Sequence, residues 1–457
     1  MKKRNLFLFF TFIIIISCSI VFFQYGSDFF WHLKSGEYII SNHSIPKIDV
    51  FSWYASSQQL KWISHEWLFE VFLYSIYHVF STFGILFLIT LILISISTII
   101  WKLNQESFLN HPFYTIGWAL CGTIVFANKI IPRPHLFSFL FFSLSLYIAI
   151  SNYKTPTKKA IYLAPIISFL WSNIHGGSSN LSYLIYGYFL LCSILRYKNI
   201  RNLETKNLIY ATVTSILAII INPHGILMLI YPYLNMSYTI MLDCIDEWQS
   251  LHLFSIDGCF YTFFILLCLY SIIKNRKSIS LSKVILLFIF IILAIKHTRM
   301  FPYFFIIASS IIPNYWKKSR IFIDIVPILI CMLVMFIVSN SYAFHVMNHS
   351  FHLISDDILT YLKNNQTKLY NSYNLGGYLI YQDIPVFIDG RADLYIDTIL
   401  CDVCQIEKGI NPSLLEQYPF DTFLVQKKNS SYNYLYFNGK YKLLIEDKDN
   451  ALFIKIK

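Results

Sequence analysis

The sequence predicts an α-helical polytopic membrane protein with a small C-terminal α/β domain, and two observations support this fold class. The first is composition: of 457 residues, 56% are hydrophobic and only 13% are charged, with a mean hydropathy of +0.54. A soluble chain of this length needs more charged residues to cover its surface, and several apolar runs approach the roughly 20 residues that cross a bilayer. The second is a change after residue 340, where long apolar runs give way to shorter, more polar segments.

We predict about 11 transmembrane helices within residues 1–340, in a helical bundle. The first apolar run follows the basic residues MKKR and lacks a convincing cleavage site, so we interpret it as a retained span. Residues 66–81 are expected to form a helix at the membrane interface, and a further crossing within 225–242 is left open. The predicted spans are 5–24, 82–103, 113–128, 135–151, 160–174, 179–195, 207–222, 259–273, 281–296, 300–314 and 320–340.

Charge fixes the expected orientation. If the N-terminus is cytoplasmic, the inner loops carry most of the Lys and Arg residues of the loops, as the positive-inside rule requires. This placement accounts for much of the net charge of +11 without any nucleic-acid partner. We therefore expect a multi-pass protein of a bacterial cytoplasmic (inner) membrane, with its N-terminus inside and its C-terminal domain outside.

Residues 341–457 are expected to form the extracytoplasmic α/β domain. A helix is predicted near 356–365, and residues 368–395 alternate like strands around turns. Asn438 and Gly439 suit a type I′ turn, which predicts a hairpin there, and the last residues of the chain read as a strand. Glycines 376, 377 and 390 are most simply turn residues.

The unusual polar residues of the membrane part fall in the loops that this orientation places outside, beginning with a long first outer loop, 25–65. One His or Trp at the end of a span is usually an interfacial anchor, but seven loops on one side carry such residues and the inner loops do not. Two cations there, Arg133 and Arg299, oppose the positive-inside trend and need an anionic partner. This segregation predicts a polar site at the outer membrane surface.

The residue types indicate the chemistry of this site. Carboxylates can act as general bases or bind a divalent metal such as Mg or Mn, and cationic side chains can hold phosphate. A carboxylate base, a phosphate clamp and a site at the level of the lipid suit transfer from a lipid phosphate, and no GxxxxGK[ST] motif for ATP is present. The catalytic candidates are Asp28, Glu66 and Glu247, with Asp28 and Glu247 as ligands of any metal. The substrate- or phosphate-binding candidates are His32, His65, Arg133, His135, His175, Lys296, His297, Arg299 and Arg391.

At these residues the chain resembles uncharacterised bacterial polytopic proteins similar to the GT-C glycosyltransferase superfamily, which includes protein O-mannosyltransferases and oligosaccharyltransferases. The resemblance runs through nearly the whole chain. The segments that carry it are DFFWHLKSGEYIISNHSIPKIDVFSW, HEWL, RPHLFSFL, WSNIHGG, NPHG, EWQS, KHTRMFPYF and NSYNLGGYLIYQDIPVFIDGRADLY.

The resemblance implies an enzyme that moves a sugar from a polyprenyl-phosphate donor to an acceptor hydroxyl on the extracytoplasmic face. In such enzymes an Asp at the start of the first outer loop is the catalytic base or a metal ligand, and Asp28 stands at the matching position. Arg133 or Arg299 would stabilise the departing phosphate. Asp28 is followed by Phe29 rather than a second acid, so the second carboxylate must come from elsewhere, with Glu66 and Glu247 as candidates.

Other functions stay open. A polymerase or ligase of surface polysaccharide would use a similar donor, and a transporter or flippase would show internal duplication and ionisable residues at mid-span. A scaffold whose outer domain binds a partner is a further alternative. Arg391 either binds acceptor or phosphate, or forms a structural ion pair with Asp389. The identities of the sugar and of the acceptor (protein, lipid or glycan) are not encoded in any motif, nor is the oligomeric state.

Overall fold

The computed structural model describes residues 22–110, 112–127, 129–238, 245, 248–315, 353–365 and 367–456. The chain divides into two compact units. The helical unit comprises, among the described residues, 22–24, 80–233 and 248–315. The mixed unit comprises 25–79, 234–238, 245, 353–365 and 367–456. Each unit is described by itself below. The domain boundary predicted at 340/341 lies outside the described residues.

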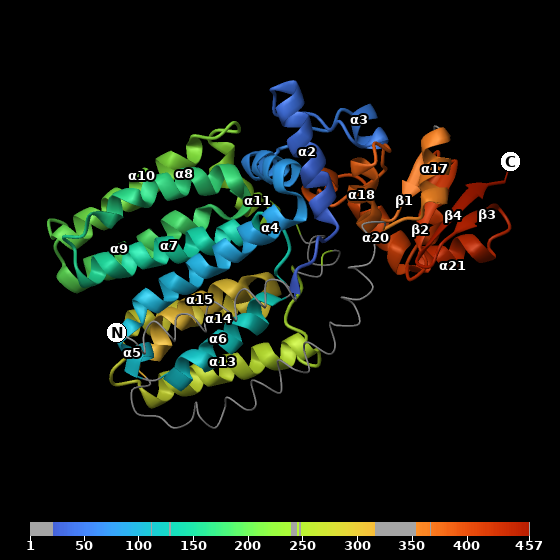
Figure 1. Ribbon diagram of the computed structural model, residues 1–457. Coiled ribbons are helices and arrows are strands. Elements are labelled where there is room, and N and C mark those ends of the chain that lie inside the picture. The colour runs from blue at the N-terminus through green and yellow to red at the C-terminus, as the bar shows by residue number, and fades with distance from the viewer. Residues whose placement is uncertain are drawn as a thin grey trace. The chain divides into compact units, whose positions relative to one another are not determined.

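The helical unit is a bundle of apolar helices (Figure 1). Its members are α4 (Trp67–Leu103, from Phe80 onward), α5 (Gln105–Asn110), α6 (Pro112–Ala127), α7 (His135–Lys154), α8 (Ala164–Ile174), α9 (Asn180–Tyr197), α10 (Leu203–Ile220), the start of α11 (Leu227–Ser237), α13 (Ile256–Lys274), α14 (Leu281–Lys296) and α15 (Phe301–Ile311). Short 3-10 turns η1 (Lys159–Leu163), η2 (Gly176–Ser178), η4 (Thr298–Met300) and η5 (Ile312–Tyr315) join them.

The surface of this bundle carries many large apolar side chains. Phe83, Phe87 and Leu91 follow one another along α4 at a spacing of four residues and are all exposed. Leu195, Leu217 and Ile273 are also exposed, on α9, α10 and α13. Water would not tolerate so much exposed hydrocarbon, whereas a bilayer does, because helices satisfy their backbone groups internally.

Among the described residues, five helices are long and apolar enough to cross a membrane: Trp67–Leu103, His135–Lys154, Gly176–Tyr197, Leu203–Ile220 and Asp257–Lys274. The other predicted spans that the structure describes are helical but shorter or less apolar, and the predicted count of about 11 is not confirmed. The spans predicted at 320–340 and over nearly all of 5–24 lie outside the described residues. In the segment 225–242, α11 is a short apolar helix that contains Pro232.

A break in α4 coincides with the boundary between the units. Ser81 has φ 50° and ψ −147°, which no residue of a continuous helix adopts. The helix predicted over 66–81 and the span predicted over 82–103 are therefore separate helical segments on either side of this residue. The first belongs to the mixed unit up to Val79, and the second to the helical unit.

The mixed unit contains a four-stranded sheet with the order β1-β2-β4-β3. Strands β1 (Leu369–Asn371) and β2 (Thr422–Gln426) are parallel, whereas β4 (Asn450–Lys455) is antiparallel to both β2 and β3 (Tyr441–Glu446). The helices of the unit are α2 (Asp28–Asn42), α3 (Trp53–Ser57), the start of α4, the end of α11, α17 (Asp356–Asn364), α18 (Gly376–Tyr381), α19 (Ala392–Tyr395), α20 (Leu400–Lys408) and α21 (Ser430–Phe437), with turns η6 (Tyr373–Leu375) and η7 (Pro412–Gln417).

The structure corrects two predictions for the C-terminal segment and confirms two. The hairpin predicted around Asn438 and Gly439 is wrong: α21 ends at Phe437, and the hairpin is formed by β3 and β4. Of the strands predicted across 368–395, only β1 is present. The other aromatic and β-branched residues of this segment belong to helix α18 or to irregular segments, where many of them are buried. The predicted helix near 356 is α17, and the predicted last strand is β4. Tertiary burial overrode local strand propensity here.

Candidate functional site

The mixed unit holds helix α2 between two close backbone contacts. A side chain at Gly36 would lie 2.1 Å from the carbonyl oxygen of Glu70 on α4. One at Gly377 would lie 2.4 Å from the carbonyl oxygen of Ser27, just before α2. Only glycine permits these approaches. The prediction of turn residues is wrong for Gly376 and Gly377, which begin helix α18, and Gly377 lets this helix pack against the start of α2.

Asp28 is the first residue of α2 and is 6% exposed. Its carboxylate fills the space where a side chain at Gly390 would stand: an added Cβ would lie 2.1 Å from Asp28 Oδ1 and 2.8 Å from Trp31 Nε1. The indole N–H of Trp31 is buried and has no hydrogen-bond partner among the described residues. Asp28 and Trp31 therefore face one small space beside Gly390. The quoted motifs that contain them, 28–53 and 371–395, meet at this point.

The mixed unit also holds a group of ionisable side chains, which we call the histidine cluster: His32, His65, Glu66, Glu70 and Asp393. His32 lies between two carboxylates, with Nε2 3.8 Å from Glu66 Oε2 and Nδ1 3.6 Å from Glu70 Oε1. The side chains of His32 and Glu70 are each 1% exposed. An anion at this imidazole would meet two carboxylates, which disfavours the phosphate-binding role that the sequence suggested for His32.

His65 continues the cluster toward the surface. Its Nε2 lies 3.4 Å from Glu66 Oε1 and its Nδ1 lies 4.0 Å from Asp393 Oδ2. Burial disfavours the charged imidazole, but the carboxylates of Glu66 and Asp393 outweigh it and raise the pKa of His65 to about 9. His65 is therefore an imidazolium at neutral pH. The side chains of His65, Glu66 and Asp393 are 14–17% exposed, so this end of the cluster reaches water.

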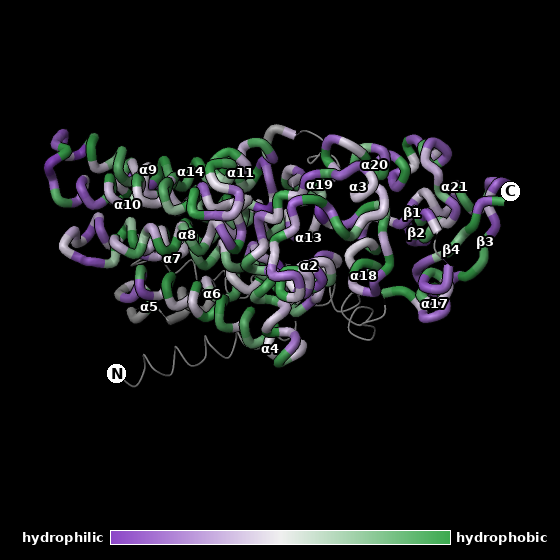
Figure 2. Tube along the Cα trace, turned by 90° about the horizontal axis from the view of Figure 1, so that it is seen from above, coloured by the Kyte–Doolittle hydropathy of each residue, from purple (hydrophilic) through white to green (hydrophobic). Residues whose placement is uncertain are grey.

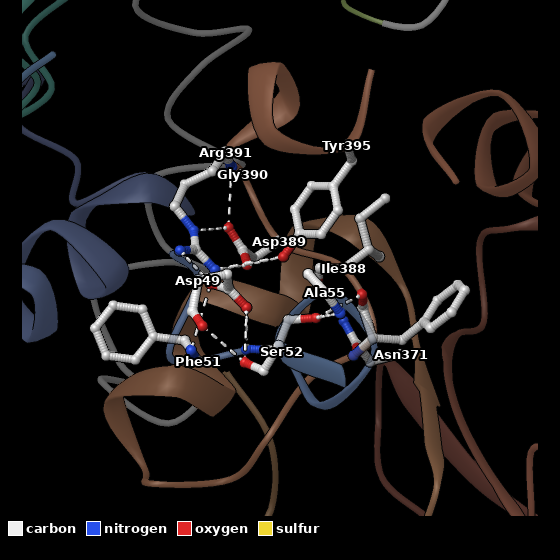
Figure 3. Close-up of polar contacts among 12 residues, drawn as sticks. Asp49, Phe51, Ser52, Ala55, Asn371, Ile388, Asp389, Gly390, Arg391 and Tyr395 are labelled. Atoms are coloured by element: carbon white, nitrogen blue, oxygen red, sulfur yellow. Dashed lines mark hydrogen bonds and ion pairs between the residues drawn. The ribbon is translucent and has the colours of Figure 1, made fainter. Parts of the chain in front are cut away.

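Arg391 belongs to a different group, which we call the arginine cluster: Asp49, Asp389, Arg391 and Tyr395 (Figure 3). Arg391 Nε and Nη2 donate to the two oxygens of Asp389 at 2.8 and 2.7 Å, and Nη1 lies 2.6 Å from Asp49 Oδ1. The hydroxyl of Tyr395 donates to Asp389 at 2.5 Å. The guanidinium also lies over the ring of Trp62, 4.5 Å from its centroid. The predicted ion pair between Arg391 and Asp389 is confirmed.

The arginine cluster joins segments that are distant in the sequence. Asp49 also accepts a hydrogen bond from the backbone N–H of Ser52 at 2.8 Å, and Ser52 pairs with Val386 in a parallel bridge. Burial lowers the pKa of the Arg391 guanidinium, but Asp389 and Asp49 outweigh this effect and raise it above its ordinary value. The guanidinium is 1% exposed, so the acceptor- or phosphate-binding role predicted for Arg391 stays a prediction without direct support.

In the helical unit, the start of α7 and the end of α8 hold a hydrogen-bonded polar group. Ser138 Oγ lies 2.6 Å from His175 Nδ1, and Trp171 Nε1 donates to Ser138 Oγ at 2.8 Å. Ser178 Oγ completes the group at 2.8 Å from Ser138 Oγ. His135, the first residue of α7, has Nε2 3.1 Å from the carbonyl oxygen of Lys129. Arg133 lies just before it, in the turn that leads into α7.

The start of α15 lies at the same end of the helical unit, because Tyr303 contacts Phe139 with ring centroids 5.0 Å apart. His297 Nδ1 lies 2.8 Å from the carbonyl oxygen of Trp248, and Arg299 lies 4.3 Å from the centroid of the Trp248 ring. Lys296 is exposed at the end of α14. Figure 2 shows hydrophilic residues at the opposite end, where α9 is joined to α10. The predicted cations and histidines of this unit therefore share one end of the bundle.

The site residues thus form two sets. Asp28, His32, His65, Glu66 and Arg391 belong to the mixed unit, and the predicted sites 133, 135, 175, 296, 297 and 299 belong to the helical unit. Glu247 lies outside the described residues. Among the described residues, no group of three or more His, Cys, Asp or Glu side chains has the arrangement of a metal site, so we derive no step through a metal.

The sequence prediction missed four members of the two clusters. Glu70 and Asp393 join the histidine cluster, and Asp49 and Tyr395 join the arginine cluster. Glu70 follows Glu66 by four residues, which is a detectable signal because residues i and i+4 share one face of a helix. Asp49 carries no local signal, since its partner lies more than 300 residues away.

Comparisons with known proteins point to one fold. No protein-family model matches this chain, and no curated protein matches it by sequence. The structure is similar to the crystal structure of the oligosaccharyltransferase of Archaeoglobus fulgidus, in which an acceptor peptide with an NVT sequon is tethered by a disulfide bond. The match has a TM-score of 0.52 at 10% identity and covers 92% of this chain and 69% of the other. At this identity the similarity shows the fold alone: an architecture like that of the oligosaccharyltransferase.

Proposed function

We propose that the protein is a membrane glycosyltransferase that moves a sugar from a polyprenyl-phosphate donor to an acceptor hydroxyl on the extracytoplasmic face. The observation that carries this proposal is the buried carboxylate of Asp28, at the start of the mixed unit of an oligosaccharyltransferase-like fold. The host membrane would be a bacterial cytoplasmic membrane, with the N-terminus inside and the mixed unit outside.

The reaction is a displacement at the anomeric carbon. The acceptor oxygen forms a bond to this carbon while the bond to the phosphate oxygen breaks, and the phosphate leaves with the electron pair. Asp28 takes the acceptor proton as general base. The backbone of Gly390 lies close to the Asp28 carboxylate and limits the space beside this carboxylate. Arg299 or Arg133 would stabilise the charge on the departing phosphate. Arg299 is held over Trp248, which would keep the guanidinium plane in place.

In this proposal Glu66 is the second carboxylate. Of the two carboxylates beside His32, Glu66 is the more exposed. Glu247 is the alternative. A requirement for Mg or Mn would need Glu247 or another residue outside the described part of the chain as an additional ligand. The sugar and the acceptor stay open.

The experiment is transfer from extracted polyprenyl-phosphate sugars by the purified full chain in lipid. Asp28→Asn is expected to lower the rate about 1,000-fold, within the range for loss of a general base. The matched control is Glu37→Gln, which removes a partly exposed carboxylate of the same helix. Equal activity of wild type and Asp28→Asn would exclude Asp28 as the base. Arg299→Ala tests the phosphate clamp, and added chelator tests the metal.

The alternative functions predict different results. A polysaccharide polymerase or ligase would be inactive with a single-sugar donor but would extend or attach a lipid-linked glycan. A transporter or flippase would move labelled lipid across a vesicle membrane without forming a glycosidic bond. If a well-folded wild type transfers sugar from no donor pool, these alternatives replace the transferase.

A further inference from the structure

Helix α2 carries a hydrogen-bond donor that has no acceptor. Trp31 is 5% exposed, and its indole N–H has no hydrogen-bond partner among the described residues. Two other tryptophans show the ordinary arrangement. Trp53 donates to the carbonyl oxygen of Leu369 at 3.0 Å, and Trp171 donates to Ser138 at 2.8 Å. A buried donor without an acceptor costs free energy, so one that lies beside the proposed base calls for a functional explanation.

The carboxylate of Asp28 lies next to this donor. An added Cβ at Gly390 would lie 2.1 Å from Asp28 Oδ1 and 2.8 Å from Trp31 Nε1, so these two atoms are no farther apart than the sum of the two distances. They do not form a hydrogen bond with each other, since Trp31 Nε1 has no partner among the described residues. One ligand oxygen about 2.8 Å from each atom could bridge such a separation. A donor and an acceptor therefore lie within reach of a single ligand atom.

The backbone beside Trp31 is fixed by other contacts. The Asn371 side chain donates to the carbonyl oxygen of Ile388 at 2.8 Å (Figure 3). The Tyr373 hydroxyl donates to the carbonyl oxygen of Gly390 at 3.2 Å. The arginine cluster holds the same turn through two short ion pairs. The carbonyl groups of this turn thus cannot move toward the indole N–H without breaking hydrogen bonds, which leaves this donor for a ligand.

The pair of Asp28 and Trp31 selects the chemistry of that ligand. A phosphate oxygen could accept from Trp31 but would face the carboxylate of Asp28. A protonated amine offers only donors and would leave the indole N–H unpaired. A carboxamide would need two atoms, its nitrogen toward Asp28 and its oxygen toward Trp31. A hydroxyl meets both groups with one oxygen, because this oxygen donates one hydrogen bond and accepts another.

We propose that Trp31 binds the acceptor substrate by donating its indole N–H to the hydroxyl oxygen whose proton Asp28 removes. This inference rests on the proposed function and names a specificity-determining residue of that same site. One lone pair of the hydroxyl oxygen accepts from Trp31, and the other forms the bond to the anomeric carbon. The O–H proton passes to Asp28, and the bond from the anomeric carbon to the phosphate oxygen breaks with its electron pair. A hydrogen bond donated to the attacking oxygen does not make it more nucleophilic, so we expect Trp31 to act on acceptor binding rather than on the maximal rate.

The first arm of the test measures transfer by the full chain in lipid, with the acceptor supplied as a membrane extract and varied by dilution. Trp31→Phe removes the N–H and keeps a ring against His32, whose centroid lies 3.7 Å from that of Trp31. We expect about tenfold more acceptor to be needed for half of the maximal rate, as for the loss of one hydrogen bond, with the maximal rate and the KM for the donor changed less than about threefold.

Trp53→Phe is the matched control, because it removes an indole N–H that already has a backbone acceptor, and it should need no more acceptor than wild type. An unchanged acceptor requirement in Trp31→Phe would overturn the proposal. A fall in the maximal rate alone would overturn it as well, because a contact that binds the acceptor must act on its half-saturating amount.

The second arm measures binding and needs no activity. The indole ¹⁵N–¹H signals of the nine tryptophans are recorded in lipid, and those of Trp31 and Trp53 are assigned by their loss in the two Phe variants. The probes are glycerol for a hydroxyl, acetamide for a carboxamide and inorganic phosphate for an anion. Glycerol should move the Trp31 signal downfield to a plateau, while the Trp53 signal stays in place. A Trp31 signal that ignores glycerol, or that responds only to acetamide or phosphate, would refute the assignment of a hydroxyl ligand.

The two arms separate this proposal from the proposed function. If wild type transfers no sugar while glycerol shifts the Trp31 signal, the transferase is refuted and the hydroxyl-binding site remains. If wild type transfers sugar and Trp31→Phe needs no more acceptor, the transferase stands and the role of Trp31 is refuted.

Discussion

The two ionic clusters of the mixed unit differ in the distances between their charged groups. In the arginine cluster the contacts of Arg391 with Asp49 and Asp389 lie at 2.6–2.8 Å. In the histidine cluster the contacts lie at 3.4–4.0 Å, with His32 between two carboxylates. A closed ion pair holds its protons and its shape, whereas a looser group of acids and bases can change protonation. The comparison indicates that two aspartates hold Arg391 in one place, whereas the ion pairs of the histidine cluster are longer.

The largest expected effect is the loss of Arg391. Arg391→Met should lower the free energy of unfolding by about 3–5 kcal/mol, because Asp49 and Asp389 would remain as buried charges without a cation. Thermal unfolding of the protein in lipid checks this value. The triple variant Asp49→Leu, Arg391→Met, Asp389→Leu removes all the charges and should recover part of the loss. A stable single variant would show that the cluster is not structural.

The next effect is expected at Gly390, which lies beside Asp28 and directly precedes Arg391 in the sequence. In Gly390→Ala the new Cβ would lie 2.1 Å from Asp28 Oδ1 and would displace this carboxylate. Transfer should fall about 100-fold, the typical cost of moving a catalytic group by about 1 Å. Gly439→Ala is the matched control, since a Cβ there meets nothing within 4 Å. Wild-type activity in Gly390→Ala would contradict the proposed position of the base.

A smaller effect is expected on the pH dependence of the free energy of unfolding, through His65 of the histidine cluster. The folded protein raises the pKa of His65 to about 9, above the ordinary value of 6.5. The stabilisation from His65 is therefore complete below pH 6.5 and is lost as pH rises through 9. We expect the free energy of unfolding to fall by about 2 kcal/mol over this range, and His65→Gln to remove most of this slope. Chemical unfolding at several pH values measures it, and an identical slope in His65→Gln would refute the ionic contacts of His65.

The smallest effect is expected for an exposed ion pair of the same unit. Lys34 contacts Asp383 at 2.7 Å and Glu37 at 2.8 Å, but the Asp383 side chain is 75% exposed. Lys34→Ala should change the free energy of unfolding by less than about 1 kcal/mol, because water screens such pairs. Thermal unfolding in lipid checks this prediction. A larger loss would mean that short distance, rather than burial, decides the strength of these clusters.

Much of the membrane part could be predicted from the sequence. Apolar runs bounded by basic loops gave the helices from α6 to α15 within a few residues, because a helix that meets lipid must be apolar along its whole length. The C-terminal segment was harder. Its strands β1 and β2 are short, and α18 and α21 contain aromatic residues typical of strands, so that burial decided their conformation.

The candidate site was predictable in part. Asp28, His32, His65 and Glu66 stood out as polar residues directly after the first apolar run, and Gly390 and Arg391 as members of a polar motif. The partners of these residues were not predictable. Asp49 pairs with Arg391, and Asp393 approaches His65, across more than 300 residues of chain, and no local pattern encodes such a pair.

The sequence by itself determined the class of this protein: a helical membrane chain with its reactive residue types gathered in one set of loops. It could do so because hydropathy and charge act locally, on each segment as it meets lipid or water. Only the tertiary structure decided which of those residues work together. It paired Arg391 with two buried aspartates, placed Asp28 against Gly390 and left His32 between two carboxylates, because these contacts depend on how distant segments pack.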